Sequence, residues 1–568
     1  MKKMFPAATI LLLTLLLLAG ALAGGCMGQK TNYTLRIIPP RNLEFPLQGS
    51  WEIVSLLQDD TDDTDDADGT NDTAAAGEPA REWIGKTLHF ADQYALIGEH
   101  LLLNPCYQVK RVEAEGYLLY HHQAFPEGFR FKNTEIEVFT LSDSHLFFCE
   151  LLRENDGELL LNLFNNSYIV KKIADKVDET VFAPFITANA AADESGADTS
   201  ALIDTGSPED APGNQTGVLL GLCAPVKNDQ GNTGTQYRTL WLALTDRELA
   251  PVLEAETILF PRRSGFYRLQ VVRKAEGKAE EDFLVVDNIM GKEEKEPPAE
   301  TPPLSDAVEP ALTIDPARWE GKEGYIHRRI NYIGNDYVSV EERLKQNFVS
   351  GGSSGEGSRL QIFAVDSLPA MKPVKISDLA GPEALAAMEH GRQKLIQQLG
   401  AEQIVPHLQD EDSYGLARKM GYWIFKGRVN YREKDREEKD SGEENKVNEE
   451  LQAKTYRNMN YADYNITVIP PDHVVFYNNL NIPWTRVKNH VPSTVDVFTS
   501  PDKDMALVVT DTEIIVYRMH QGNLFAHPLK KIPLREGEEV IMAEWALGHY
   551  VENWTLTFQT YLAGESTG

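Results

Sequence analysis

Cysteine and positive charge are both scarce in this sequence. It has 4 cysteines among 568 residues, and none belongs to a CxxC element, which argues against a zinc site built from cysteine. Lys and Arg together number 55 against 86 Asp and Glu, so the net charge is −31. Phosphate backbones and anionic lipid headgroups repel a chain this acidic. The composition therefore excludes nucleic-acid binding and attachment to a membrane through a basic patch.

The motifs of several enzyme classes are also missing. The chain has no Gly-rich turn ending in Lys-Ser or Lys-Thr before a helix, and no HExxH spacing among its 13 histidines. Ser353 and Ser354 lie in a Gly/Ser stretch, without the strand–turn–helix context of serine hydrolases. We therefore assign no catalytic and no cofactor-binding residues from motifs.

Two features invite a metal interpretation, and neither has the required pattern. The acidic run Thr64–Gly69 is similar to the start of a calcium loop. Its first ligand position is Thr64, however, and its twelfth is Ala75, where a bidentate Glu is needed. His121 and His122 are adjacent, so on a predicted strand they face opposite ways. The sequence assigns no metal site.

The N-terminal segment has the three parts of a secretory signal. Met1–Lys3 is basic, an apolar run rich in leucine extends from about Ala7 to Leu22, and small residues precede Cys26. The order of basic start, apolar core and small-residue cleavage site predicts that residues 1–25 are a signal peptide. The apolar run is too short, and too closely followed by polar sequence, for a spanning helix.

The tetrapeptide Ala23–Cys26 resembles the lipobox of bacterial lipoproteins, although Ala23 stands where that family more often has Leu. The resemblance implies that the thiol of Cys26 is acylated and that the protein is anchored on the extracytoplasmic side of the cell membrane. Two acyl chains suffice for stable anchoring. In a Gram-negative cell, Met27 gives no signal for retention on the inner membrane, where an Asp would, so an outer-membrane location stays open.

Composition divides the remaining chain into a tether, two globular regions and a linker. We predict a tether at 26–44, an antiparallel barrel at 45–175, a low-complexity linker at 176–215 and a β-propeller-like domain at 216–563. Polar inserts near 274–309, 349–358 and 432–454 interrupt the last region. The predicted fold class is therefore all-β, with one or two helices in inserts.

In the first region, short apolar segments separated by turn residues predict antiparallel hairpins. Gly49–Trp51 precedes the first of them and is similar to the opening of lipocalin-type barrels, whose tryptophan closes the barrel floor. The predicted strands are 52–57, 117–120, 135–140, 145–151, 159–163 and 168–173.

The second region contains one segment with a specific resemblance. Phe498–Tyr517 resembles a blade of TolB-like β-propellers, in which Ser-Pro-Asp forms a tight turn before a buried strand. Weak repeats support this interpretation: Phe260–Tyr267 aligns with Leu416–Trp423, and Leu242–Asp246 with Leu507–Asp511. The usual blade size predicts roughly six or seven blades for this length. Arg262, Arg263, Arg418 and Lys419 recur at equivalent positions, which favours structural pairing over a substrate site.

One segment departs from the β pattern. Pro382–Leu399 has apolar residues near helical spacing, with Pro382 in a favourable first-turn position and Gly400 just past the end. We predict an amphipathic helix that lies across the propeller-like domain; a helix that binds a partner is the alternative.

Three cysteines remain once Cys26 is assigned to the anchor, namely Cys106, Cys149 and Cys223. Because three is an odd number, at most one disulfide forms within the chain. Cys106 and Cys149 fall in one predicted domain and are the candidate pair; three free thiols are the open alternative.

Glu544 is the acid that stands out, because it interrupts the apolar run Val540–Ala546. On a strand its side chain faces away from those of Ala543 and Trp545. A buried carboxylate needs a partner. The pattern favours a structural acid, paired with arginine or at a blade edge, over a catalytic one.

These features predict a non-catalytic, lipid-anchored binding platform in the cell envelope, with envelope proteins or glycans as partners. Two alternatives stay open. One is an envelope hydrolase that uses carboxylates at the propeller face. The other is a small-ligand site inside the N-terminal barrel.

Overall fold

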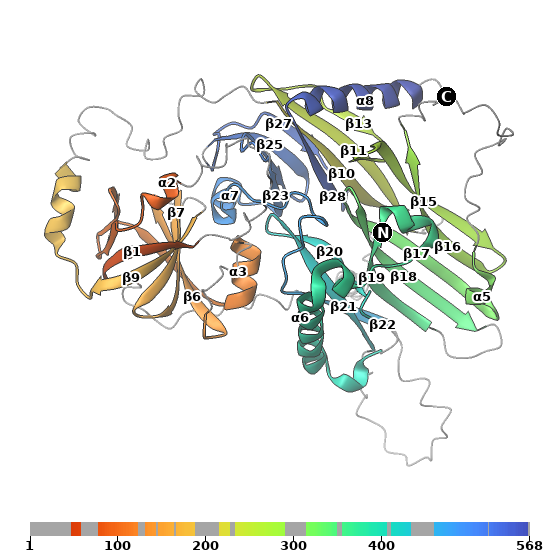
Figure 1. The fold of residues 1–568 in the computed structure, drawn as a ribbon, viewed down its shortest axis with the longest axis horizontal. Helices are drawn as coiled ribbons and strands as arrows, with labels where there is room; N and C mark the ends of the chain where they lie inside the picture. The colour runs from red at the N-terminus through yellow and green to blue at the C-terminus, as the bar shows by residue number, and fades with distance from the viewer. Residues whose placement is uncertain are drawn as a thin grey trace, which may run out of the picture. The chain divides into compact units, whose positions relative to one another are not determined.

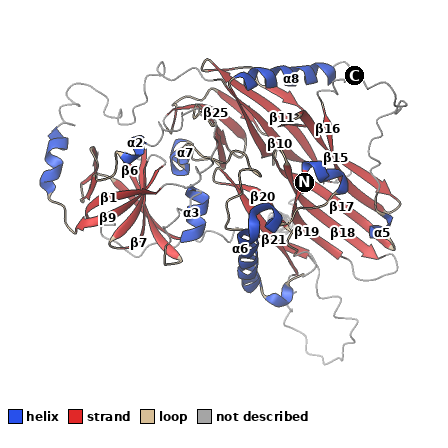
Figure 2. Cartoon of the chain, in the orientation of Figure 1, coloured by secondary structure: helices blue, strands red, loops and turns tan. Residues whose placement is uncertain are grey.

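Strands form most of the secondary structure in the computed structural model of the chain (Figure 2). The signal peptide, Cys26, the tether and the acidic run Thr64–Gly69 lie outside the described residues. The structure describes residues 47–57, 78–122, 131–143, 146–163, 166–187, 215–227, 233–289, 314–348, 355–405, 410–432, 459–520 and 522–565. The predicted all-β class, with a barrel-like sheet followed by a propeller-like domain, is confirmed.

The N-terminal region is one nine-stranded sheet curved into a half-barrel. All of its pairings are antiparallel, in the order β4-β3-β2-β1-β9-β8-β7-β6-β5, so β1 joins the first hairpins to the last. Its elements are β1 (Gly49–Leu57), α2 (Glu78–Arg81), β2 (Thr87–Phe90), β3 (Tyr94–Ile97), β4 (His100–Leu103), β5 (Cys106–Glu113), α3 (Ala114–His122), β6 (Glu135–Asp143), β7 (Leu146–Asn155), β8 (Glu158–Leu163), β9 (Asn166–Ala174) and η2 (Glu179–Phe182).

The first strand shows why its opening residues are required. Gly49 has a φ of 111°, and a Cβ there would lie 2.2 Å from the carbonyl oxygen of Ala174, so only glycine fits. Two residues on, Trp51 is 2% exposed and packs with Leu88, Phe139 and other apolar side chains of this sheet. These side chains fill the concave face of the half-barrel.

Two expectations for this region need correction. Tyr117–Tyr120, which we predicted as a strand, lies in helix α3, with all four side chains buried. A run of four apolar residues fits a buried helix as well as a strand. The half-barrel also continues into the predicted linker, because η2 buries Phe182 beside Leu96 and Leu101. Residues 188–214 of that linker are outside the described part of the chain.

The second region contains four sheets in a four-bladed propeller-like arrangement, fewer than the six or seven blades that its length suggested. Blade 1 is β10 (Thr216–Lys227), β11 (Thr233–Thr245), β12 (Glu248–Leu249), β13 (Leu253–Ala255) and β28 (Glu539–Leu547). Blade 2 is β14 (Ile258–Arg262), β15 (Gly265–Glu276), β16 (Ala279–Asn288), β17 (Lys322–Ile333), β18 (Tyr337–Phe348) and β19 (Gly355–Ala364). The length estimate failed because blade 2 has six strands, several of them 12 residues long.

The two remaining blades are smaller. Blade 3 is β20 (Tyr414–Lys419), β21 (Tyr422–Arg432) and β22 (Met459–Asn465). Blade 4 is β23 (Asp496–Thr499), β24 (Met505–Val509), β25 (Glu513–His520), β26 (Asn523–Leu524) and β27 (Lys530–Pro533). The TolB-like segment is blade 4, and its Ser500 Oγ accepts the backbone N–H groups of Asp504 and Met505 at 3.1 and 3.0 Å, which closes the predicted turn.

Apolar contacts and ion pairs join the four blades in a ring. Leu219 of β10 packs with Ile330 of β17, which joins blades 1 and 2. Tyr332 packs on Trp423 of β21 at a ring-centroid distance of 4.7 Å, which joins blades 2 and 3. The last two joints are Arg418 with Asp496 between blades 3 and 4, and Leu220 with Leu507 between blades 4 and 1.

The ring is closed by strands from its two ends. β10, the first strand of the region, pairs antiparallel with β28, the last, from Thr216 opposite Leu547 to Cys223 opposite Glu539. β10 and β11 are buried on both faces, since even-numbered residues such as Leu220 face blade 4 and odd-numbered ones such as Leu219 face blade 2. This explains their nearly continuous apolar sequences.

The helices of this region lie against the blades (Figure 1). The predicted helix is α6 (Ile376–Leu399), which packs on β21 and β22. It has non-helical residues at Ala380 and Gly381, so a new helical run begins at Pro382, as predicted. The other helices are η4 (Val365–Ala370), α5 (Pro316–Trp319), η5 (Ala401–Gln403), α7 (Trp484–His490) and α8 (His549–Glu565). α8 crosses β11, β13 and β28 and adds Val551 and Phe558 to the core between blades 1 and 2.

Candidate functional site

Glu544 lies on β28, the terminal strand of blade 1, directly opposite Leu219 of β10. The strand alternation is as predicted. Ala543 and Trp545 face blade 4, whereas Met542 and Ala546 belong to the apolar core that faces blade 2. Glu544 therefore projects toward blade 2 from between two apolar neighbours on its own strand.

The Glu544 carboxyl has no hydrogen-bond or ion-pair partner among the described residues, and its side chain keeps partial access to solvent. The predicted pairing with arginine is therefore wrong, whereas the predicted edge position is right. Removal from water disfavours the charged form, and this burial raises the pKa of Glu544 to about 8. At neutral pH the carboxyl is consequently protonated.

Tyr332 of β17 is a titratable group whose pKa responds to the charge of Glu544. Burial and, after it, the Glu544 carboxylate raise the pKa of the Tyr332 phenol, which is 2% exposed. Its hydroxyl donates to the carbonyl oxygen of Val474 at 2.6 Å, so its single proton is already committed. Tyr332 therefore offers Glu544 no strong donor.

The surroundings of Glu544 do not match a glycosidase site. Such a site needs two carboxyl groups that flank the bond to be cleaved. Asp336, the other acid that affects Tyr332, is held by Arg262 at 3.2 Å. Within the described part of the chain, no second unpaired carboxylate accompanies Glu544. The arrangement supports a structural, proton-holding role for this acid.

The arginines that recur in the aligned hairpins are structural, as predicted. Arg262 donates to the carbonyl oxygen of Asn335 at 2.9 Å and pairs with Asp366 at 2.7 Å, which ties β14 to the far turns of its own blade. Arg418 pairs with Asp496 at 2.7 Å and lies 3.9 Å from the ring of Phe498, which ties blade 3 to blade 4. At the second basic position, Arg263 is exposed whereas Lys419 is partly buried, so the two residues have different environments.

Sequence reasoning missed the buried acids of the chain, among them Glu150 of β7. Its side chain is 4% exposed, and three groups converge on its carboxylate. Tyr117 of α3 donates its hydroxyl to Oε1 at 2.5 Å, His122 Nε2 lies 3.1 Å from Oε2, and Lys110 Nζ lies 3.7 Å from Oε1. The available signal was the one that flagged Glu544, because Glu150 also interrupts an apolar run, Leu146–Leu152.

The partners of Glu150 reverse the effect of its burial. Burial alone would raise the pKa of Glu150, but the hydrogen bond from His122 and the charge of Lys110 lower it to about 2. Asn162 Nδ2 lies 3.1 Å from the same His122 Nε2, and the Ser167 hydroxyl donates to Asn162 Oδ1 at 2.7 Å. It therefore joins α3 to three neighbouring strands, β7, β8 and β9.

The two histidines beside this acid differ, because His122 bonds to Glu150 whereas His121 is a packing group. The ring of His121 stacks on Tyr117 with centroids 4.0 Å apart, and burial lowers the pKa of His121 to about 3, so it is neutral at physiological pH. Both histidines end helix α3 rather than lying on a strand, which corrects the geometry that we expected for them. No cluster of metal-binding side chains occurs among the residues that the structure describes.

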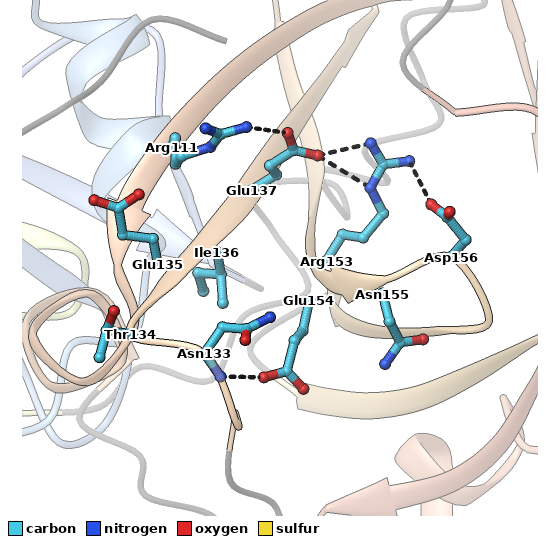
Figure 3. A pocket seen from close by; sticks show the side chains of 10 residues that line it. All are labelled: Arg111, Asn133, Thr134, Glu135, Ile136, Glu137, Arg153, Glu154, Asn155 and Asp156. Atoms are coloured by element: carbon cyan, nitrogen blue, oxygen red, sulfur yellow. Dashed lines mark hydrogen bonds and ion pairs between the residues drawn. The ribbon is translucent and has the colours of Figure 1, made fainter. Parts of the chain in front are cut away.

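A polar pocket of ≈ 570 Å³ lies at the β5 end of the half-barrel sheet (Figure 3). On β6, Glu137 points to the same face as Phe139 and Leu141 of the apolar core. Glu137 lines the pocket and forms ion pairs with Arg153 at 2.7 Å and with Arg111 at 3.1 Å. Burial acts to raise the pKa of Glu137, but these two arginines hold it below its usual value. The pocket is lined by Arg111, Asn133, Thr134, Glu135, Ile136, Glu137, Arg153, Glu154, Asn155 and Asp156.

The cysteines of the half-barrel are free thiols in the structure. Cys106 of β5 is opposite Ser142, and Cys149 of β7 is opposite Leu141, so β6 lies between them. The disulfide that we considered is therefore not formed. Cys223 is also free and buried, and Arg329 Nη2 lies 3.1 Å from its sulfur.

Comparison with known proteins adds no family. No family model matches the chain, and no curated protein matches its sequence. Within the described residues, no helix has the length and apolarity needed to cross a membrane. The fold alone thus defines the class: an all-β chain with a half-barrel and a four-bladed propeller-like arrangement.

Proposed function

We propose that this protein is a lipid-anchored, extracytoplasmic binding platform of the cell envelope. The observation that carries the proposal is the lipobox-like sequence Ala23–Cys26 behind a basic start and an apolar core. The net charge of −31 gives the protein no electrostatic attraction to anionic lipid. Acyl groups on Cys26 would therefore supply the membrane attachment.

The non-catalytic part of the proposal is supported by how the acids are used. Glu150 is held by Lys110 and Glu137 by two arginines, whereas Glu544 is alone among apolar neighbours. The hydrolase alternative required a cluster of inward carboxylates, and the surroundings of Glu544 give it no support. Buried apolar side chains fill the half-barrel around Trp51, so the ligand alternative would have to use the polar pocket around Glu137.

The anchor is tested by replacing the sulfur of Cys26 with an oxygen. The full chain and its Cys26→Ser variant are expressed in a bacterial host that acylates lipoproteins, and fatty-acid incorporation and membrane partitioning are measured. We expect both to be lost in the variant. Unchanged acylation and partitioning would overturn the anchor. A Cys106→Ser variant, which alters an exposed thiol, is the matched control.

The platform role is tested with the acylated protein and envelope extracts. We expect one or more envelope proteins or glycans to be retained by the immobilised chain and eluted by salt or competing extract. The opposite result is an absence of any retained partner together with turnover of a glycan or peptide by the purified protein. That result would favour the hydrolase alternative.

A further inference from the structure

β28 closes the ring by pairing with β10 inside blade 1, and one face of the same strand forms part of the seam between blade 1 and blade 2. β28 packs on β17 across this seam, and Ile541 and Met542 share its apolar core with Ile330 and Ile333. Any charge that appears in this layer acts directly on ring closure, since burying an unpaired charge is costly.

Two glutamates of β28 differ in their partners at this seam. Glu539 at the start of the strand pairs with Arg329 of β17 at 2.8 Å, and its side chain is 57% exposed. Glu544, further along the strand, acts on the pKa of Tyr332 of the same neighbouring strand and has no cationic partner among the described residues. The two acids form a natural pair for comparison, because they share strand, neighbour and chemistry.

The other titratable groups around Glu544 are engaged elsewhere or are exposed. Arg329 of β17 is committed to Glu539, and Tyr332 donates to Val474. β10 contributes Cys223, whose sulfur lies near Arg329, at the Glu539 end of the seam. On α8, which packs against β28, His549 and Glu552 are exposed to solvent. None of these groups supplies a compensating positive charge to Glu544.

We propose that closure of the propeller-like ring depends on a proton held by Glu544: β28 stays packed against β17 while this carboxyl is neutral and loosens when it ionises. This pH-dependent loosening of β28 is separate from the proposed lipid anchor and binding role. It would make the blade 1–blade 2 seam the part of the ring that opens first as pH rises.

The direction of the pH dependence follows from linkage. A carboxyl whose pKa is higher in the folded than in the unfolded chain contributes stability that is complete below the unfolded value. That contribution is lost as pH rises through the folded value, here about 8. Between the unfolded and folded values the opening constant rises by at most about tenfold per pH unit. Partial solvent access of Glu544 makes the real slope shallower.

The test is amide hydrogen exchange of the full chain between pH 5 and pH 9, corrected for intrinsic exchange rates. We expect protection of β28 and β10 to fall by tenfold or more across this range, while β24 in blade 4 changes little. In Glu544→Gln, which keeps the shape without the ionisation, protection of β28 becomes independent of pH. In Glu539→Gln the pH dependence persists.

Two outcomes would overturn the proposal. The first is an equal pH dependence of β28 protection in the natural chain and in Glu544→Gln. The second is a natural chain whose β28 protection is constant from pH 5 to pH 9. The second outcome needs no variant, so the proposal can be refuted even if Glu544→Gln does not fold.

Discussion

Two glutamates, one in each region of the molecule, have pKa values that are shifted in opposite directions. Glu150 in the half-barrel is surrounded by Tyr117, His122 and Lys110, and its pKa is lowered to about 2. Glu544 in the propeller-like ring faces apolar side chains, and its pKa is raised to about 8. Both interrupt apolar strands in the sequence. The difference shows that the partners supplied by neighbouring elements, rather than burial itself, set the charge of a core acid.

The largest effect is expected from removing the acid that has partners. Glu150→Ala leaves the Tyr117 hydroxyl, His122 and Lys110 without their acceptor, and breaking a buried pair in this way costs about 3–5 kcal/mol. Urea unfolding of the full chain at pH 7 measures the loss. Glu135→Gln, at an exposed position of β6, should change stability by less than about 0.5 kcal/mol. Equal effects of the two variants would refute the assigned network.

Lowering the pH should remove the stability that the Glu150 carboxylate contributes. Because the folded pKa of Glu150 is depressed to about 2, its contribution is present above its unfolded value and is lost as pH falls through the folded value. The loss amounts to about 3 kcal/mol between roughly pH 4.5 and pH 2. Subtracting the acid unfolding profile of Glu150→Gln from that of the natural chain isolates this part. Superimposable profiles would show that Glu150 is not stabilised as a carboxylate.

Replacing Glu544 should have the opposite effect on stability from replacing Glu150. Glu544→Leu removes a group that is costly to ionise in an apolar seam, so it should stabilise the chain by about 2 kcal/mol at pH 8 and by less at pH 5. Thermal or urea unfolding at the two pH values measures the change. Glu552→Leu on the exposed face of α8 serves as the control. Destabilisation by Glu544→Leu at pH 8 would mean that the carboxylate has a partner.

The smallest effects should come from the two arginines in the aligned hairpins. Arg418→Met leaves Asp496 unpaired, with only 13% of its side chain exposed, at a cost of about 2 kcal/mol. Arg262→Met should cost at most about 1 kcal/mol, because its partner Asp366 is 80% exposed. The difference between the two variants is measured by urea unfolding. The reverse order of costs would contradict the assignment of Arg418 as the tie between blades 3 and 4.

Much of the fold could be predicted from local patterns. Alternation and turn residues located β6 to β9, and Ser500–Asp504 located the turn of blade 4. The pattern failed at Tyr117–Tyr120, because a short apolar run is ambiguous and only the docking of Tyr117 onto Glu150 selects the helix. The number of blades could not be predicted, since the estimate assumed the usual blade size, whereas six strands, β14–β19, form the single sheet of blade 2.

The candidate site was predictable only in part, for a related reason. An acid within an apolar run reveals that burial will perturb it, and this identified Glu544 from the sequence. The sign of the perturbation depends on which side chains β17 and α3 bring near, and those are set by tertiary structure. Arg329 reaches Glu539 but not Glu544, although both acids lie on one strand.

The most direct test of these opposed charge states is infrared difference spectroscopy of the carboxyl stretch at pH 7. The natural chain is compared with Glu544→Gln and with Glu150→Gln. The account predicts a protonated carboxyl band in the natural chain that disappears in Glu544→Gln and remains in Glu150→Gln. A natural chain without that band, or a band lost in Glu150→Gln instead, would contradict it.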